Sequence, residues 1–201
     1  INIDGVFTGM VAGSYVVNVT DDNGCSSELS VNVTEPDPTT TAAAGSDQSL
    51  CASSSATLAG NNALVGVGTW TLESGTGTIT DPSDPASGVT GLGIGTNVFR
   101  WTIDNAACFN SNFDEVTIVN NPLPTASISG TNTICTGGST SLTVVFTGTA
   151  PYTYSYSNGV TTFGPFTTSN NPENIVVSPA TTKTYSMVTV DDNNCSGTVS
   201  G

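Results

Sequence analysis

The chain has 201 residues, with 16 Asp and Glu, 2 Lys and Arg and no His, and carries a formal net charge of −14. This charge repels phosphate backbones, so nucleic acid is excluded as a partner. No apolar run approaches the ~18 residues of a membrane span, which excludes membrane insertion. Because His, the usual general base near neutral pH, is missing, we expect no enzymatic activity. With 36% hydrophobic and 9% charged residues, the composition favours thin sandwich cores over disorder.

Three stretches of eleven residues recur along the chain and predict strands. Residues 15–25 (YVVNVTDDNGC), 98–108 (VFRWTIDNAAC) and 185–195 (YSMVTVDDNNC) each combine an alternating β-branched or aromatic strand, an Asp, a polar turn and a Cys. This pattern is typical of a strand that enters a hairpin. A second repeat relates GSDQSLCASSSATL at 45–58 to GTNTICTGGSTSL at 130–142. The period of ~85 residues is the size of an immunoglobulin-like (Ig-like) sandwich.

The period divides the chain into units. Residues 1–36 are the tail of a first unit, 37–121 form a complete second unit, and 122–201 form most of a third. Pro-containing connectors at 35–38 and 120–124 predict short, extended joints, because Pro stiffens a linker. No window carries a helical apolar stripe. The predicted fold is therefore all-β, with tandem Ig-like β-sandwich domains in a linear array.

Strands are expected in both of the longer units. In the second unit they lie near 55–59, 67–72, 76–80, 95–103 and 113–119. In the third unit they lie near 125–129, 140–147, 152–157, 174–178 and 183–190, and a last strand begins after Cys195.

Two segments resemble known surface proteins. Residues 13–33 (GSYVVNVTDDNGCSSELSVNV) resemble the end of the SprB-type repeats of giant adhesins of the Bacteroidota, and 133–159 (TICTGGSTSLTVVFTGTAPYTYSYSNG) are similar to the start of the related Ig-like or PKD-like modules. The resemblance implies a large, surface-displayed protein that is exported by the type IX secretion system and used in adhesion or gliding motility. The second unit departs from this pattern, because residues 104–108 read DNAAC instead of DxNGC.

The cysteines predict disulfides and an extracellular location, and the resemblance implies that this location is the cell surface. Neither a CxxC motif nor a Cys/His pair is present for zinc, so all five are disulfide candidates: Cys25, Cys51, Cys108, Cys135 and Cys195. Two pairing schemes stay open. Pairing within units joins Cys51 to Cys108 and Cys135 to Cys195. Pairing between stacked units joins Cys51 to Cys195 and leaves the other three for neighbouring repeats.

Calcium is the one cofactor with candidate ligands. These are acidic residues in or beside the hairpin turns: Asp21, Asp22, Asp104, Asp191 and Asp192. In an Ig topology the turn before the last strand faces the preceding unit, so a joint can supply several of the six to eight oxygens that calcium takes. The same Asp-Asp-Asn-Gly pattern also suits an unliganded turn.

The remaining candidate residues favour structural roles. Arg100 and Lys183 are the two cations, and both lie in predicted strands, so we expect the folded chain to survive trypsin. Trp70 and Trp101 also occupy predicted strands, where core burial is favoured over a sugar-stacking platform. A row of tyrosines shares one face of a strand, namely Tyr152, Tyr154 and Tyr156. That face is either exposed and adhesive or covered by the opposing sheet.

The leading interpretation is a structural or adhesive stalk or filament segment of a large bacterial surface adhesin, used in cell attachment or gliding. Its partners are then neighbouring repeats of the same chain, with surface glycans or other cell-surface proteins as further candidates. The alternative is a carbohydrate-binding Ig-like module of a secreted multidomain hydrolase. Flanking sequence discriminates between them, since further repeats favour the stalk and an adjacent catalytic domain favours the module.

Overall fold

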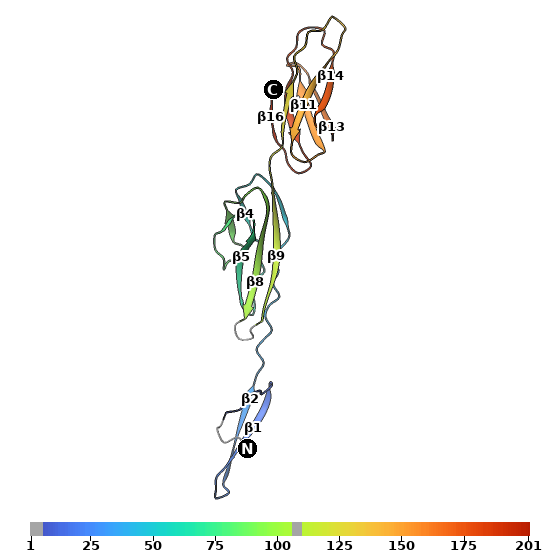
Figure 1. Cartoon of the computed structure of the whole chain (residues 1–201). Helices are drawn as coiled ribbons and strands as arrows, with labels where there is room; N and C mark the ends of the chain where they lie inside the picture. Colours follow the sequence, from blue (N-terminus) through green and yellow to red (C-terminus); the bar gives the residue numbers. More distant parts are fainter. Residues whose placement is uncertain (1–5, 106–109) are drawn as a thin grey trace.

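The chain forms three groups of strands along an extended molecule (Figure 1). The computed structural model describes residues 6–105 and 110–201. We call the three groups the N-terminal hairpin (β1 and β2), the middle sandwich (β3 to β9) and the C-terminal sandwich (β10 to β16). Within the described residues, no helix is long and apolar enough to cross a membrane. The unit boundaries at residues 36 and 121 stay a prediction.

The N-terminal hairpin pairs β1 (Gly13–Thr20) with β2 (Ser26–Val33) in antiparallel register. In its turn the backbone N–H of Asp21 donates to the Cys25 carbonyl at 2.9 Å. Gly24 has a φ of 86°, which residues with a side chain rarely adopt. Apolar side chains such as Val16 and Leu29 are exposed, because no second sheet packs on this hairpin among the described residues.

The middle sandwich consists of a sheet with the order β3-β9-β8-β5 and a sheet with the order β4-β7-β6. Its strands are β3 (Gln48–Cys51), β4 (Ser55–Thr57), β5 (Val67–Ser74), β6 (Thr78–Ile79), β7 (Gly88–Thr90), β8 (Gly95–Asn105) and β9 (Asn110–Asn121). Trp70 and Trp101 lie in the core between the sheets, 2% and 1% exposed, with ring centroids 5.0 Å apart. The two tryptophans are thus core residues, as expected.

The C-terminal sandwich has sheets with the orders β14-β11-β10-β16 and β13-β12-β15. Its strands are β10 (Thr125–Ser129), β11 (Thr140–Thr147), β12 (Tyr152–Ser157), β13 (Thr162–Thr168), β14 (Glu173–Val177), β15 (Ser186–Asp191) and β16 (Thr198–Ser200). Tyr152, Tyr154 and Tyr156 are buried in its core, where Phe146 stacks on Tyr152 at 4.6 Å between centroids. The opposing sheet therefore covers the tyrosine face.

Two differences from the expected strands have physical reasons. The alternation pattern does not predict β13, because Pro165 interrupts it. Proline removes a ladder donor and is tolerated at a sheet edge, which is where β13 lies. The placement of Lys183 in a strand is wrong. Lys183 is exposed in the loop that precedes β15, since regular pairing begins only at Ser186.

Candidate functional site

The two sandwiches meet at a three-residue linker. β9 ends before residues 122–124, and β10 begins directly after them. The backbone N–H of Thr198, the first residue of β16, donates to the Pro124 carbonyl at 3.0 Å. Gly197 packs so closely that a Cβ there would lie 1.9 Å from the same oxygen. The turn between β15 and β16 therefore packs directly against the linker.

A disulfide between Cys51 and Cys195 crosses this joint. Cys51 ends β3 of the middle sandwich, and Cys195 lies in the β15–β16 turn of the C-terminal sandwich. Their Cα atoms are 5.8 Å apart, within the usual range for a disulfide. The structure thus contains the pairing between units.

The pairing within units is wrong for both bonds that it requires, because Cys51 and Cys195 are bonded to each other. The geometric reason is that Cys51 pairs with Asn121 at the end of β9, whereas the end of β8 pairs with the start of β9, Asn105 with Asn110, at the opposite end of the sheet. Cys108 itself lies outside the described residues.

Cys51 is held in place by the end of β9. Its parallel partner is Asn121, whose carbonyl accepts the N–H of Ala52 at 2.8 Å. The side chain of Asn120 is buried and holds the next residue of the loop: Oδ1 accepts the Ser53 N–H at 3.0 Å, and Nδ2 donates to the Ser53 carbonyl at 2.7 Å. A buried amide that is satisfied on both sides fixes the backbone. Cys51 is therefore presented at the end of the sandwich that faces the linker.

The turn that carries Cys195 is organised by one carboxylate. Asp192 Oδ1 accepts the N–H groups of Asn194 at 2.8 Å and Cys195 at 2.7 Å, and Oδ2 accepts the Thr149 N–H at 2.8 Å. Burial acts to raise the pKa of Asp192, but the three backbone hydrogen bonds outweigh it and hold this pKa below its ordinary value. The ionised carboxylate thus fixes Cys195 opposite Cys51.

A turn of the same kind carries Cys25 in the N-terminal hairpin. Here Asp21 Oδ1 accepts the N–H groups of Asn23 at 3.0 Å and Cys25 at 2.8 Å. In both turns one Asp carboxylate therefore holds the cysteine N–H. The Asp precedes the Cys by four residues in this turn and by three in the other. Cys25 is exposed and carries a free thiol.

In the sequence repeat that relates residues 45–58 to residues 130–142, Cys135 corresponds to Cys51. It too is exposed and free. It borders an open hollow of about 540 Å³ that is also lined by Leu142, Lys183 and Tyr185. Pairing of Cys25 and Cys135 with neighbouring repeats stays a prediction.

The acidic residues considered for calcium do not form a cluster. Within residues 6–105 and 110–201, no three His, Cys, Asp or Glu side chains gather in a group able to hold a metal ion. One carboxylate oxygen of Asp21 and both of Asp192 accept backbone N–H groups. Asp22 is exposed in the hairpin turn.

The other two calcium candidates lie in strands, Asp104 in β8 and Asp191 in β15. Beside Asp104, Asn105 Nδ2 donates to the Asp37 carbonyl at 3.4 Å, so this end of the middle sandwich approaches the preceding joint. Calcium binding itself stays a prediction. Melting curves recorded in calcium and in excess chelator test it, because a ligand of the native state raises the melting temperature.

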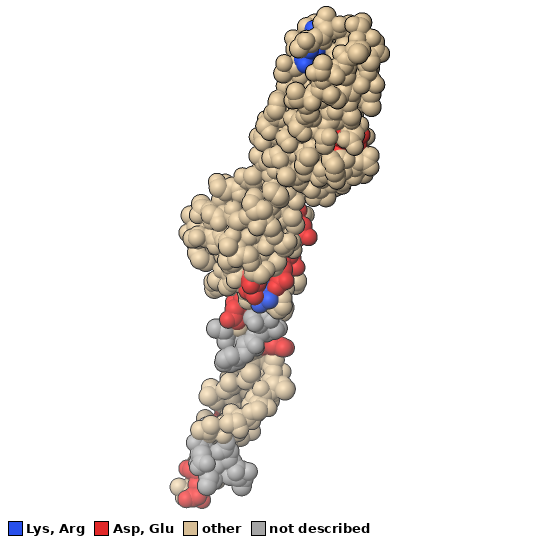
Figure 2. Space-filling view, turned by 45° about the horizontal axis from the view of Figure 1, so that its top comes forward, with Lys and Arg blue, Asp and Glu red and all other residues tan. Residues whose placement is uncertain are grey.

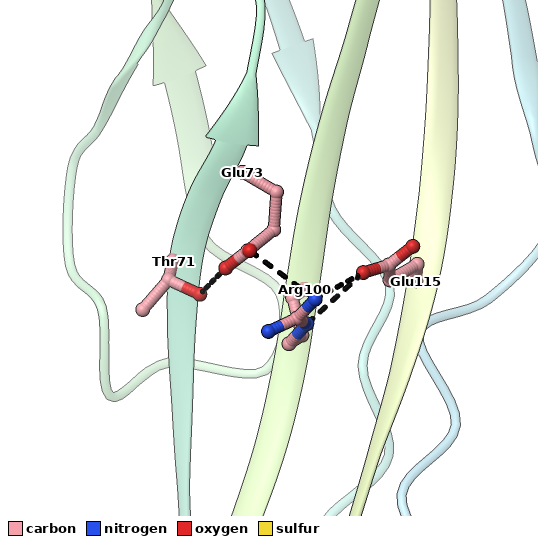
Figure 3. A network of polar contacts seen from close by, with 4 residues as sticks. All are labelled: Thr71, Glu73, Arg100 and Glu115. Atoms are coloured by element: carbon pink, nitrogen blue, oxygen red, sulfur yellow. Dashed lines mark hydrogen bonds and ion pairs between the residues drawn. The ribbon is translucent and has the colours of Figure 1, made fainter.

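Arg100 connects three strands of the middle sandwich (Figure 3). Its Nε and Nη2 atoms donate to Glu115 Oε1 at 3.0 and 2.7 Å, and Nη2 lies 3.2 Å from Glu73 Oε2. Thr71 Oγ1 donates to the other Glu73 oxygen at 2.8 Å, and the guanidinium lies 4.3 Å from the Phe113 ring centroid. The charged side chains are about a third exposed, so each ion pair contributes at most ~1 kcal/mol to the free energy of unfolding. The cluster therefore links β5, β8 and β9 through Arg100.

The surface charge is uneven along the molecule (Figure 2). In that view, Asp and Glu gather on the lower part of the middle sandwich and at the lower end of the hairpin, while most of the C-terminal sandwich is uncharged. Only two cations are present in the whole sequence. The face in view therefore offers no basic patch for a polyanion.

Two residues of the joint have roles that the sequence pattern does not indicate. The sequence pattern marks Asp192 as a metal ligand and Asn120 as part of a linker. In the structure, Asp192 holds the backbone N–H of Cys195, and Asn120 holds the backbone of the loop that follows Cys51. For Asp192 the usable signal is its spacing of two and three residues from the N–H groups that it accepts. For Asn120 the sequence holds no signal, because a buried amide and a linker amide look alike.

Comparison with known proteins places the fold. No protein-family model matches the sequence, and no curated protein matches it significantly. Among solved structures, an I-band fragment from titin aligns with 94% of this chain and 74% of its own length, with a TM-score of 0.52 and 13% identity. The PKD domain from the KIAA 1837 protein aligns with 44% of this chain and 93% of its own, with a TM-score of 0.37 and 22% identity.

A structure that concerns Dscam isoform specificity aligns with 92% of this chain and 52% of its own, with a TM-score of 0.42 and 13% identity. Of these three, the titin fragment alone exceeds a TM-score of 0.5, and at its low identity it shows the fold and nothing further. The predicted fold class is confirmed: the chain is all-β and matches tandem Ig-like domains.

Proposed function

We propose that this chain is a segment of a structural stalk or filament in a large extracellular surface adhesin. The observation that carries the proposal is the Cys51–Cys195 disulfide, which bonds two consecutive sandwiches across a three-residue linker. The prolines stiffen that linker, and the covalent bond beside it restricts bending further. An array built in this way holds whatever lies at its tip at a set distance and direction from its base.

The extracellular location is supported by the same bond, because disulfides persist in oxidising compartments. The resemblance of residues 13–33 and 133–159 to adhesin repeats supports the finer parts of the proposal. These are a bacterial cell surface, export by the type IX system, and a role in attachment or gliding.

The partners in this proposal are neighbouring repeats of the same chain. The exposed thiols of Cys25 and Cys135 support it, since each lies where the repeat pattern puts one half of a joint disulfide. Surface glycans or other cell-surface proteins are then contacted by whatever the stalk displays.

The Trp and Tyr residues that the sequence offers for carbohydrate stacking are buried. Trp70 and Trp101 are 2% and 1% exposed, and the tyrosines of β12 are buried. Sugar-stacking sites present an aromatic face to solvent, which these residues do not.

Two measurements test the proposal. Immunogold labelling of intact source cells with antibodies against residues 37–201 is expected to mark structures that project from the surface. A glycan array probed with the full chain is expected to show no saturable binding. Label that is confined to the culture medium, together with saturable binding of one glycan class, would favour the carbohydrate-binding module instead.

A further inference from the structure

The Cys51–Cys195 disulfide closes a covalent loop around most of both sandwiches. Its cysteines are 144 residues apart, so that β4 to β15 lie inside the loop and β1 to β3 and β16 lie outside it. A pull on the two ends of the chain passes from Cys51 through the sulfur atoms to Cys195. We propose that this bond carries tensile load past both sandwiches, which makes the joint inextensible. This rests on the proposed stalk function and states how the stalk bears force.

The segment that transmits load to Cys51 is already extended, so it can lengthen little under tension. Residues 42–51 run beside β9, and four of their contacts with that strand join positions 70 residues apart: Ala42 with Asn112, Ala44 with Asp114, Asp47 with Thr117 and Gln48 with Ile118. A constant offset means that the segment runs parallel to β9 in extended form. A load that arrives at residue 42 therefore reaches Cys51 with little gain in length.

The exit from the bond is anchored as well. Cys195 is held by the Asp192 carboxylate, and three residues later β16 pairs in parallel with β10, where Thr198 lies opposite Thr125. The Thr198 N–H also bonds the Pro124 carbonyl of the linker. Load thus leaves the bond at the joint and does not have to cross the core of the C-terminal sandwich.

Without the bond, the same pull enters the sheets. β3 is parallel to β9, and β10 is parallel to β16, so that the first and last strands of each sandwich are hydrogen-bonded to each other. Pulling the ends apart shears these pairs. Once they fail, the chain inside the loop is drawn out. At ~3.5 Å per residue, the loop of 144 residues holds about 500 Å of chain that the disulfide withholds.

Single-molecule pulling tests the proposal on the full chain, with one handle at each terminus. The parent protein carries Cys25→Ser, Cys108→Ser and Cys135→Ser, so that Cys51 and Cys195 are its only cysteines. The matched variant carries Cys51→Ser and Cys195→Ser in addition. The oxidised parent is expected to extend by the segments outside the loop alone. The variant is expected to gain about 500 Å more, because the extended loop of 144 residues then replaces a bond that spans 5.8 Å between Cα atoms.

A second measurement keeps the test decisive if the variant folds poorly. Dithiothreitol added to the folded parent during pulling is expected to release the same additional length. A long gain in the oxidised parent, or free thiols at Cys51 and Cys195 in that protein, overturns the proposal. The surface-labelling result is independent of this length, so failure of the load path and failure of the stalk function are distinguishable.

Discussion

The aspartate carboxylates of the described residues bond mainly to backbone N–H groups. Asp21 and Asp192 each hold the N–H of a cysteine, and the hydroxyl and N–H of Ser83 hold the pKa of Asp81 below its ordinary value. The sequence has two cations for 16 acidic residues, so backbone donors take the place of ion pairs. The turns are thereby specified without surface charge of opposite sign.

Glycine at position 68 is required by the packing of the middle sandwich. A Cβ at Gly68 would lie 2.0 Å from Cζ2 of Trp101. We expect Gly68→Ala to lower the free energy of unfolding by about 1 to 3 kcal/mol, because the indole must move to admit the methyl group. Urea unfolding followed by tryptophan fluorescence measures it, with Thr69→Ala at the adjacent exposed position as the control. Equal midpoints for Gly68→Ala and the control would contradict this account.

The lowered pKa of Asp192 predicts that the stability of the C-terminal sandwich depends on pH. Its pKa is lowered in the folded state, so its stabilisation is fully present above the ordinary value of 3.8 and is lost as the pH falls through the lower folded value. Asp192→Ala is expected to be less stable than the wild type at pH 7, by a margin that shrinks below pH 3.8. Unfolding followed by tyrosine circular dichroism measures that margin. The exposed Asp22→Ala is the control, and a margin that does not change with pH would count against the role given to Asp192.

Strand placement changes the expected response to trypsin. Arg100 lies in β8, which is paired on both sides by β5 and β9, whereas Lys183 is exposed in the loop between β14 and β15. The expectation that the chain survives trypsin because both residues lie in strands is therefore revised. Proteases cut exposed loops that open locally and spare paired strands.

The first trypsin cut is expected after Lys183. The product 184–201 contains Cys195, so it stays bonded to the rest of the chain until the disulfide is reduced. Electrophoresis is expected to show one band of unchanged mass without reductant and a shortened chain with it. Lys183→Gln is expected to abolish the cut. An initial cut after Arg100 would show that β8 is not held as described.

At the scale of the whole molecule, the joint decides how the sandwiches are oriented. Each sandwich has its own hydrophobic core. We expect Cys51→Ser with Cys195→Ser to lower the melting temperature, because the bond closes a loop of 144 residues in the unfolded chain, and to widen the range of angles between the folded sandwiches. Small-angle X-ray scattering is expected to report a broader distance distribution.

The matched control for this experiment is Cys25→Ser with Cys135→Ser, which removes two free thiols and keeps the joint bond. Its scattering is expected to equal that of the wild type. If the variant without the joint bond also scatters as the wild type does, the three-residue linker alone sets the angle.

Local patterns in the sequence were sufficient for the all-β fold and for many strands. The bounds of β10, β11 and β12 agree with the alternation of apolar residues, and the hairpin turns follow from Asp, Asn and Gly. These features depend on neighbours along the chain, because side chains alternate across a strand and turns need particular φ values. The recurrence of such patterns along the chain indicates an array of domains without any knowledge of how the strands pair.

Tertiary structure alone decided the features that join distant residues. The sequence leaves two disulfide schemes open, and the choice depends on which ends of the sandwiches meet, because the two bonded cysteines are 144 residues apart along the chain. The tyrosine face of β12 was decided by the sheet that covers it, and the place of Lys183 by where pairing of β15 begins. Alternation predicts that a strand has two faces, but only the packing of a second sheet determines which face is buried.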